Sequence, residues 1–204
     1  MFDARIRPLI DPPLNALGRG LAGMGVTANG VTLIGFAFGV LAAILIVFGQ
    51  PIWALVFIGL SRLADGLDGA VARAAGGSDF GGFLDIVCDF AFYGLIPMAF
   101  VFADPAANGA AGAFLLCSFY VNGASFLAYA VLAEKHEMES KARGEKALYF
   151  TGGILEGAET IGFFVLLCLL PAWFAPLSWV FGALCFITAT SRVLLAWRVF
   201  GAIR

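Results

Sequence analysis

Residues 65–89 decide the fold and read DGLDGAVARAAGGSDFGGFLDIVCD. They join the end of one long apolar run to the start of the next through a glycine-rich turn. Asp65 and Asp68 are three residues apart, and Asp85 and Asp89 are four apart. Each pair therefore shares one face of a helix. The spacing predicts two neighbouring helices whose four carboxylates converge in one cavity.

The chain around this stretch has the composition of a membrane protein. Of its 204 residues 61% are hydrophobic and 13% are charged, and the mean hydropathy is +0.95. Soluble domains hold about 45–50% apolar and about 25% charged residues. A soluble enzyme, a secreted disulfide scaffold and a disordered chain are therefore excluded. Apolar runs near the length that crosses a bilayer predict six membrane-spanning helices, at 27–49, 52–73, 81–102, 109–133, 154–173 and 176–197.

The segment before the first span, residues 2–22, alternates apolar and charged side chains near helical spacing. We expect an amphipathic helix on the membrane surface, bent or broken at Pro8 and Pro12–Pro13. It lacks the apolar centre of a signal peptide, so we expect the mature chain to keep it. The predicted fold is an all-α polytopic membrane protein, a single domain over 1–204 with the six-helix bundle at 27–197.

The distribution of Lys and Arg predicts the orientation. The loops expected on one side, at 50–51, 103–108 and 171–176, carry neither residue. The other side holds Arg5, Arg7, Arg19, Arg73, Lys135, Lys141, Arg143, Lys146, Arg192, Arg198 and Arg204. The positive-inside rule therefore places both termini and the carboxylates on the cytoplasmic side, in what we expect to be a bacterial inner membrane.

Carboxylates within apolar helices require compensation. Each costs about 2.5–3.5 kcal/mol at a helix centre on insertion scales. Arg73 lies on the same stripe but cannot neutralise four acids. Because the cluster offers only oxygen ligands, with one histidine in the whole chain and four isolated cysteines, it indicates a hard divalent cation, Mg²⁺ or Mn²⁺.

Small residues surround the carboxylates. Gly66, Gly69, Ala70 and Ala72 lie on or beside their face, and Ser78 follows as a helix cap or a phosphate contact. Such residues leave room for a ligand, and with bound metal and an arginine they suit a diphosphate substrate. Close packing of membrane helices is the alternative explanation for the glycines.

The motif Asp65-x-x-Asp68-Gly69-x-x-Ala72-Arg73, seven residues, then Gly81-x-x-x-Asp85-x-x-x-Asp89 resembles the signature of the CDP-alcohol phosphotransferases. The opening of the first span, Thr27-x-Asn29-x-x-Thr32, extends the resemblance, with Ala28 where the family usually has proline. The resemblance implies transfer of a phosphatidyl group from a CDP-activated lipid to an alcohol acceptor, with release of CMP.

The resemblance also implies roles for individual residues and a homodimer. Asp65, Asp68 and Asp85 would hold one or two divalent ions, Mg²⁺ or Mn²⁺, on the diphosphate. Asp89 would be the catalytic general base and a further metal ligand. The CDP-lipid would be bound by residues listed in chain order: Asn29, Thr32, Asp65, Gly69, Ala72, Arg73 and Ser78.

The acceptor alcohol is left open by the sequence. Residues 125–133, where phosphate-accepting relatives carry basic side chains, have none. Arg192 is either a phosphate ligand or a positive-inside anchor. Glu156 and Glu159 share a helix face and predict either an acceptor pocket, suited to an amine-bearing alcohol, or interfacial carboxylates.

Two other functions are weighed against the enzyme. A divalent-cation or proton-coupled transporter also uses intramembrane acids, but the acids here do not continue toward the outer face. A scaffold gives no reason to keep four acids in lipid. A nucleic-acid partner is not expected.

Overall fold

The computed structural model describes residues 3–136, 155 and 157–201, and these residues contain helices and no strand. The chain is therefore all-α, as predicted. The helices are α1 (Asp3–Gly23), α2 (Ala28–Val47), α3 (Pro51–Ala75), α4 (Asp79–Ala103), α5 (Pro105–Lys135), α7 (Gly157–Leu169), the short 3₁₀ helix η2 (Pro171–Trp173) and α8 (Phe174–Phe200).

Each apolar run predicted to span the membrane corresponds to one of these helices. Among the described residues, four helical stretches are long and apolar enough to cross a bilayer: α2, α4, α5 and the stretch from η2 through α8. Helix α3 has 25 residues but carries the charged motif, and the described part of α7 has 13. A polytopic membrane protein is confirmed, and the count of six spans stays a prediction.

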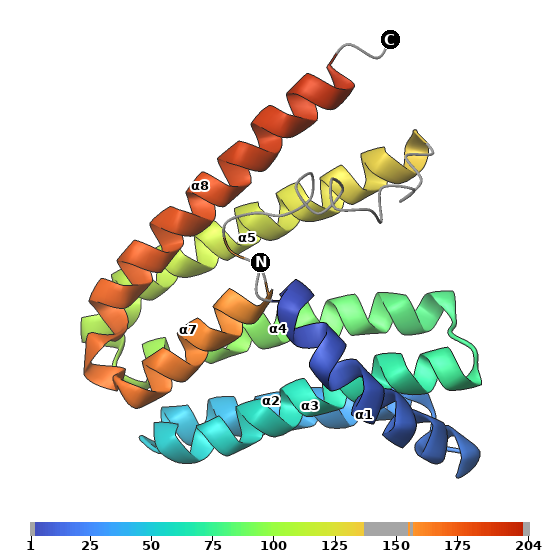
Figure 1. The fold of residues 1–204 in the computed structure, drawn as a ribbon. Coiled ribbons are helices and arrows are strands. Elements are labelled where there is room, and N and C mark those ends of the chain that lie inside the picture. The colour runs from blue at the N-terminus through green and yellow to red at the C-terminus, as the bar shows by residue number, and fades with distance from the viewer. Residues whose placement is uncertain (1–2, 137–154, 156, 202–204) are drawn as a thin grey trace.

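The helices pack as a compact group and a paired arm (Figure 1). Helix α2 contacts both α3 and α4, α1 crosses α3, and α7 also lies against α3. Helices α5 and α8 run side by side along much of their length. The motif-bearing helices α3 and α4 are thus held through a shared neighbour, α2.

Helix α1 differs from its prediction. It is continuous from Asp3 to Gly23, so of the bend or break expected at Pro8 and Pro12–Pro13, the break does not occur. A proline fixes φ near its helical value, which permits the helix to continue at the loss of a hydrogen bond. Packing on α3 offsets that loss, since a Cβ on Gly18 would lie 2.7 Å from Ala70.

Local signals set the helix ends near the site. The Thr27 hydroxyl accepts a hydrogen bond from the Gly30 amide, 3.2 Å away, and begins α2. The Ser78 hydroxyl does the same for the Gly81 amide at 3.0 Å and begins α4. Gly76 ends α3 at φ +91°, a conformation that favours glycine. The reversal between the two motif halves is therefore encoded locally.

The core is aromatic and lies beside the motif. Phe92 of α4 is fully buried and packs edge-on against Phe164 of α7, with ring centroids 5.9 Å apart. A Cβ on Gly39 of α2 would lie 2.6 Å from the Phe92 ring. The absence of a side chain at Gly39 therefore allows α2 and α4 to approach each other.

Gly39→Val should destabilise the protein by about 1–3 kcal/mol, because the added side chain overpacks against Phe92. We expect a lower midpoint of thermal unfolding, followed by intrinsic tryptophan fluorescence in detergent micelles. Gly59→Ala is the matched control, since a Cβ there meets no atom within 4 Å. Equal midpoints for the two variants would contradict the packing described.

Candidate active site

The carboxylates of Asp65, Asp85 and Asp89 form the centre of the site. Each offers one oxygen, and these oxygens all lie within 4.8 Å of one another. Asp65 comes from the middle of α3, whereas Asp85 and Asp89 come from consecutive turns of α4. All three side chains are partly exposed, so a ligand can reach them. The structure thus brings together acids from both halves of the motif.

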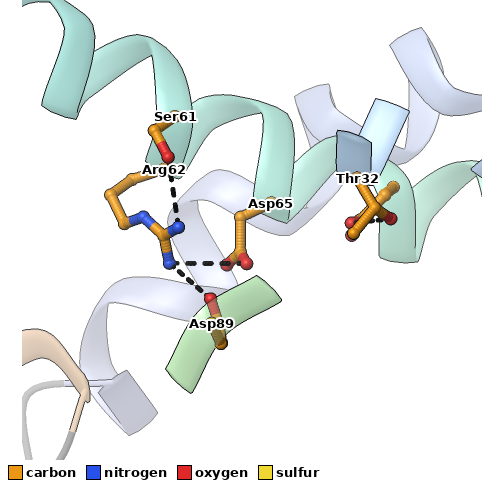
Figure 2. A network of polar contacts seen from close by, with 6 residues as sticks. Thr32, Ser61, Arg62, Asp65 and Asp89 are labelled. Carbon is orange, nitrogen blue, oxygen red and sulfur yellow. Dashed lines mark hydrogen bonds and ion pairs between the residues drawn. The ribbon is translucent and has the colours of Figure 1, made fainter. Parts of the chain in front are cut away.

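Asp68 has a different environment from the other three acids. It is 6% exposed, and its Oδ2 accepts a hydrogen bond from the Thr32 hydroxyl at 2.6 Å. It does not belong to the group of three, although we expected four converging carboxylates. Thr32 of α2 therefore supplies a hydrogen-bond donor to one acid of the motif. Figure 2 shows the Thr32 side chain beside α3.

Arg62 lies within the site, and the sequence pattern did not single it out. Its Nη1 donates a hydrogen bond to Asp89 Oδ1 at 2.8 Å and lies 3.4 Å from Asp65 Oδ1 (Figure 2). The sequence places Arg73 on the same stripe as the acids, whereas in the structure Arg62 is the arginine that contacts Asp65 and Asp89. Arg62 lies three residues before Asp65, so the same i, i+3 rule that paired the aspartates would have found it.

Arg73 lies at the other end of the motif. Its Nε and Nη2 donate to the Asn15 side-chain oxygen of α1, at 3.2 and 2.9 Å. It is exposed, and its Nη1 would lie 3.3 Å from a Cβ on Gly69. Arg73 therefore pairs with the surface helix rather than with the group of three carboxylates.

The other residues predicted to bind nucleotide lie around the beginnings of α2 and α4. Ser78 caps α4, the first of the two roles we considered for it. Asn29 Oδ1 would lie 3.0 Å from a Cβ on Gly81, which brings the opening of α2 beside that cap. Ala72 lies on α3 between Gly69 and Arg73 and is partly exposed. These residues gather where α2, α3 and α4 meet.

The residues predicted for an acceptor pocket are only partly described. Arg192 of α8 is buried, and its Nη1 donates to α5: to the Asn122 carbonyl at 3.0 Å, to Asn122 Oδ1 at 2.9 Å and to Ser125 Oγ at 2.6 Å. Glu159 lies in the first turn of α7 and is partly exposed. Glu156 lies outside the described residues. Arg192 thus links α8 to α5.

The donor set fits a hard divalent cation. Carboxylate oxygens are the ligands that Mg²⁺ and Mn²⁺ prefer. Opposite ligands of one Mg²⁺ stand about 4.2 Å apart, so oxygens within 4.8 Å need only small side-chain movements to share an ion. The geometry supports metal binding by the acids of α3 and α4.

A family model described as CDP-alcohol phosphatidyltransferase matches residues 25–200. The chain belongs to this family of membrane enzymes. The match confirms the resemblance seen in the motif and disfavours the transporter. The match therefore shows the enzyme class, CDP-alcohol phosphatidyltransferase, and leaves the acceptor alcohol open.

Relatives of known sequence extend over most or part of the chain. The inner membrane protein YnjF of Escherichia coli is 50% identical over 193 residues, covering 95% of this chain and 94% of that protein. A phosphatidylinositol phosphate synthase of Corynebacterium glutamicum is 35% identical over 67% of this chain and 59% of its own length. An archaetidylinositol phosphate synthase of Pyrococcus horikoshii is 41% identical over 42% of this chain and 46% of its own length.

Solved structures share the fold. The phosphatidylinositol phosphate synthase PgsA1 of Mycobacterium tuberculosis with CDP-DAG bound superposes with a TM-score of 0.66 at 23% identity, covering 90% of this chain and 93% of that one. The same protein in complex with manganese and citrate gives a TM-score of 0.64 at 22% identity, covering 90% and 88%.

Thr32→Val should destabilise this CDP-alcohol phosphatidyltransferase by about 1.5–3 kcal/mol, because the buried Asp68 carboxylate loses a hydrogen-bond donor. The measurement is the midpoint of thermal unfolding. Thr188→Val is the control, since the buried Thr188 hydroxyl donates, within the described part of the chain, to the Leu184 carbonyl of its own helix. A loss as large for Thr188→Val would show that the carboxylate is not the cause.

Proposed function

We propose that this protein transfers a phosphatidyl group from a CDP-activated lipid, such as CDP-diacylglycerol, to the hydroxyl of an alcohol in a metal-dependent reaction. The observation that carries the proposal is the group of three carboxylates, Asp65, Asp85 and Asp89, within the family motif. The structural relative solved with CDP-DAG and with manganese supports the same donor and cofactor.

The aspartates of α3 and α4 are the proposed metal ligands. Asp65, Asp85 and Asp89 hold Mg²⁺ or Mn²⁺, and Asp68 completes the set from the next turn of α3, with two ions as the proposed number. A bound cation supplies charge neutralisation on the phosphoryl oxygens and holds the reacting groups in line. Other residues of the chain hold these acids in place. The hydrogen bond from Thr32 orients Asp68, and Arg62 contacts Asp65 and Asp89.

Asp89 is the proposed general base. Its carboxylate takes the proton from the acceptor hydroxyl as the acceptor oxygen bonds to the phosphorus that carries the lipid. The bond from that phosphorus to the oxygen of CMP breaks, and CMP leaves with the electron pair. A carboxylate that is partly exposed and lies beside the other acids is positioned for this transfer.

The residues around the α2 and α4 termini are the proposed CDP-lipid contacts. Gly69 and Ala72 leave room for the cytidine, and Asn29, Thr32 and Asp65 contribute polar contacts from beside it. Arg73 and Ser78 bind phosphate oxygens. The bond from Arg73 to Asn15 indicates that α1 contributes to the same region. The surface helix would then help to orient the nucleotide.

The proposed setting is the bacterial inner membrane, with both termini and the site toward the cytoplasm. The lysine and arginine distribution supports this orientation, and the Escherichia coli relative is named an inner membrane protein. We also propose that residues 1–204 act as a single domain and that the protein is a homodimer, as the family resemblance implies.

A polyol phosphate is the proposed acceptor. Two relatives are named for phosphoinositol lipids, and Arg192 is a buried cation on the α5–α8 pair that suits a phosphate. An amine-bearing alcohol held by Glu159 and Glu156 is the alternative that the acceptor test distinguishes.

Asp89→Asn should lower CMP release by about 10²–10⁴-fold, the range for loss of an acid–base group. Asparagine at Asp65, Asp68 or Asp85 should abolish turnover, because each change removes a proposed metal ligand. Chelation with EDTA should abolish the activity, and Mn²⁺ should restore it. Asp104→Asn is the control, because Asp104 caps α5 outside the motif and asparagine caps equally well. Wild-type rates in the four motif variants would refute the proposed function.

An acceptor screen tests the polyol phosphate. Purified protein with CDP-diacylglycerol and Mn²⁺ is offered inositol phosphate, glycerol 3-phosphate, inositol, serine and choline, and CMP is measured. We expect turnover with a phosphorylated polyol and a raised KM for it in Arg192→Gln. Turnover with serine or choline alone would replace this acceptor with the amine alternative.

A further inference from the structure

Arg62 is fixed beside the carboxylates on several sides. Its guanidinium carbon lies 4.1 Å from the centroid of the fully buried Phe92 ring. Its Nη2 donates to Ser61 Oγ at 3.2 Å, and its Nη1 contacts Asp89 and Asp65. The group is therefore held by α3 and α4 together and is unlike a mobile surface arginine.

The exposed fractions of Arg62, Asp65 and Asp89 show which of the three side chains lies deepest in the site. The Arg62 side chain is 19% exposed, against 36% for Asp65 and 29% for Asp89. The buried Arg62 Nε meets no acceptor among the described residues. Arg62 thus contacts the acids from the buried side of the site, at the expense of an unsatisfied donor, and the acids keep the more accessible side.

Arg62 shares its two carboxylates with the expected metal. Asp65 and Asp89 contact the guanidinium and are also two of the three acids that can hold one ion. A guanidinium stays charged at any accessible pH. Its positive charge therefore attracts the acids toward one another and repels a cation that binds the same oxygens.

We propose that Arg62 is a positioning residue: a cation built into the chain that holds Asp65 and Asp89 together without a divalent ion and raises the metal concentration needed to load the site. The inference rests on the metal-binding role of the aspartates under the proposed function. It predicts that loss of the Arg62 charge tightens metal binding and makes stability depend on metal.

The test is a Mn²⁺ titration of the purified full-length protein in lipid nanodiscs, followed by the EPR signal of free Mn²⁺. Arg62→Met should bind Mn²⁺ about tenfold more tightly than wild type, because a positive charge in contact with two of the metal-binding carboxylates has been removed. Arg62→Gln, which keeps a donor without the charge, should behave the same way. Arg62→Lys, which keeps the charge, should bind Mn²⁺ as wild type does.

A stability measurement separates this role from a purely structural one. The midpoint of thermal unfolding of Arg62→Met should fall more in EDTA than in saturating Mn²⁺, since ions then replace the missing cation. Ser61→Ala is the matched control, because it removes the hydrogen bond from Arg62 Nη2 without removing the charge. The midpoint of thermal unfolding of this variant should therefore fall by the same amount in EDTA and in Mn²⁺.

Two outcomes would overturn the inference in different ways. Equal or weaker Mn²⁺ binding by both Arg62→Met and Arg62→Gln, with wild type binding normally, would refute the role of Arg62 and leave the proposed function intact. No Mn²⁺ binding by wild type or any variant would refute the metal role of the aspartates, and the inference with it.

Discussion

The structure depends on keeping four carboxylates inside a bundle of apolar helices. Each is costly unless a donor or cation faces it, and the described residues supply such a partner for Asp65, Asp68 and Asp89. Thr32 of α2 donates to Asp68, and Arg62 of α3 contacts both Asp65 and Asp89. The site therefore also contributes to the fold. The Thr32–Asp68 hydrogen bond joins α2 to α3, and the Arg62–Asp89 ion pair joins α3 to α4.

Helix α2 makes this arrangement possible because it packs on both motif helices. A Cβ on Gly35 would lie 2.9 Å from Ala64 of α3, and Gly39 lies under the Phe92 ring of α4. Phe92 in turn faces the Arg62 guanidinium. Gly39 of α2 is thus linked to the carboxylates through one aromatic ring. Close packing, the alternative explanation considered for the glycines beside the carboxylates, accounts for Gly35 and Gly39 of α2.

Sequence patterns were sufficient for the helices and for the pair of Asp85 and Asp89, because apolar run length and i, i+4 spacing are properties of a single helix. They were insufficient where the answer depends on two helices. Spacing does not show that Asp68 turns toward Thr32 while Asp65 joins the α4 acids, or that Arg192 joins α8 to α5. The continuity of α1 across its prolines likewise depends on contact with α3, which overrides the local signal.

The placement of Arg62 separates two kinds of positive charge: the arginine, which is part of the chain, and the metal ion, which is proposed to bind from solution. Arg62 is held by Phe92 and Ser61, so its guanidinium has a fixed position and is a permanent part of the protein. It therefore suits the buried side of the acids. The more exposed side of Asp65 and Asp89 is left accessible to the metal and substrate of the proposed reaction. Under the proposed role, a permanent cation on the one side would keep the two acids together when no ion is bound. The same charge would weaken the retention of a cation on the other side, and so favour its release.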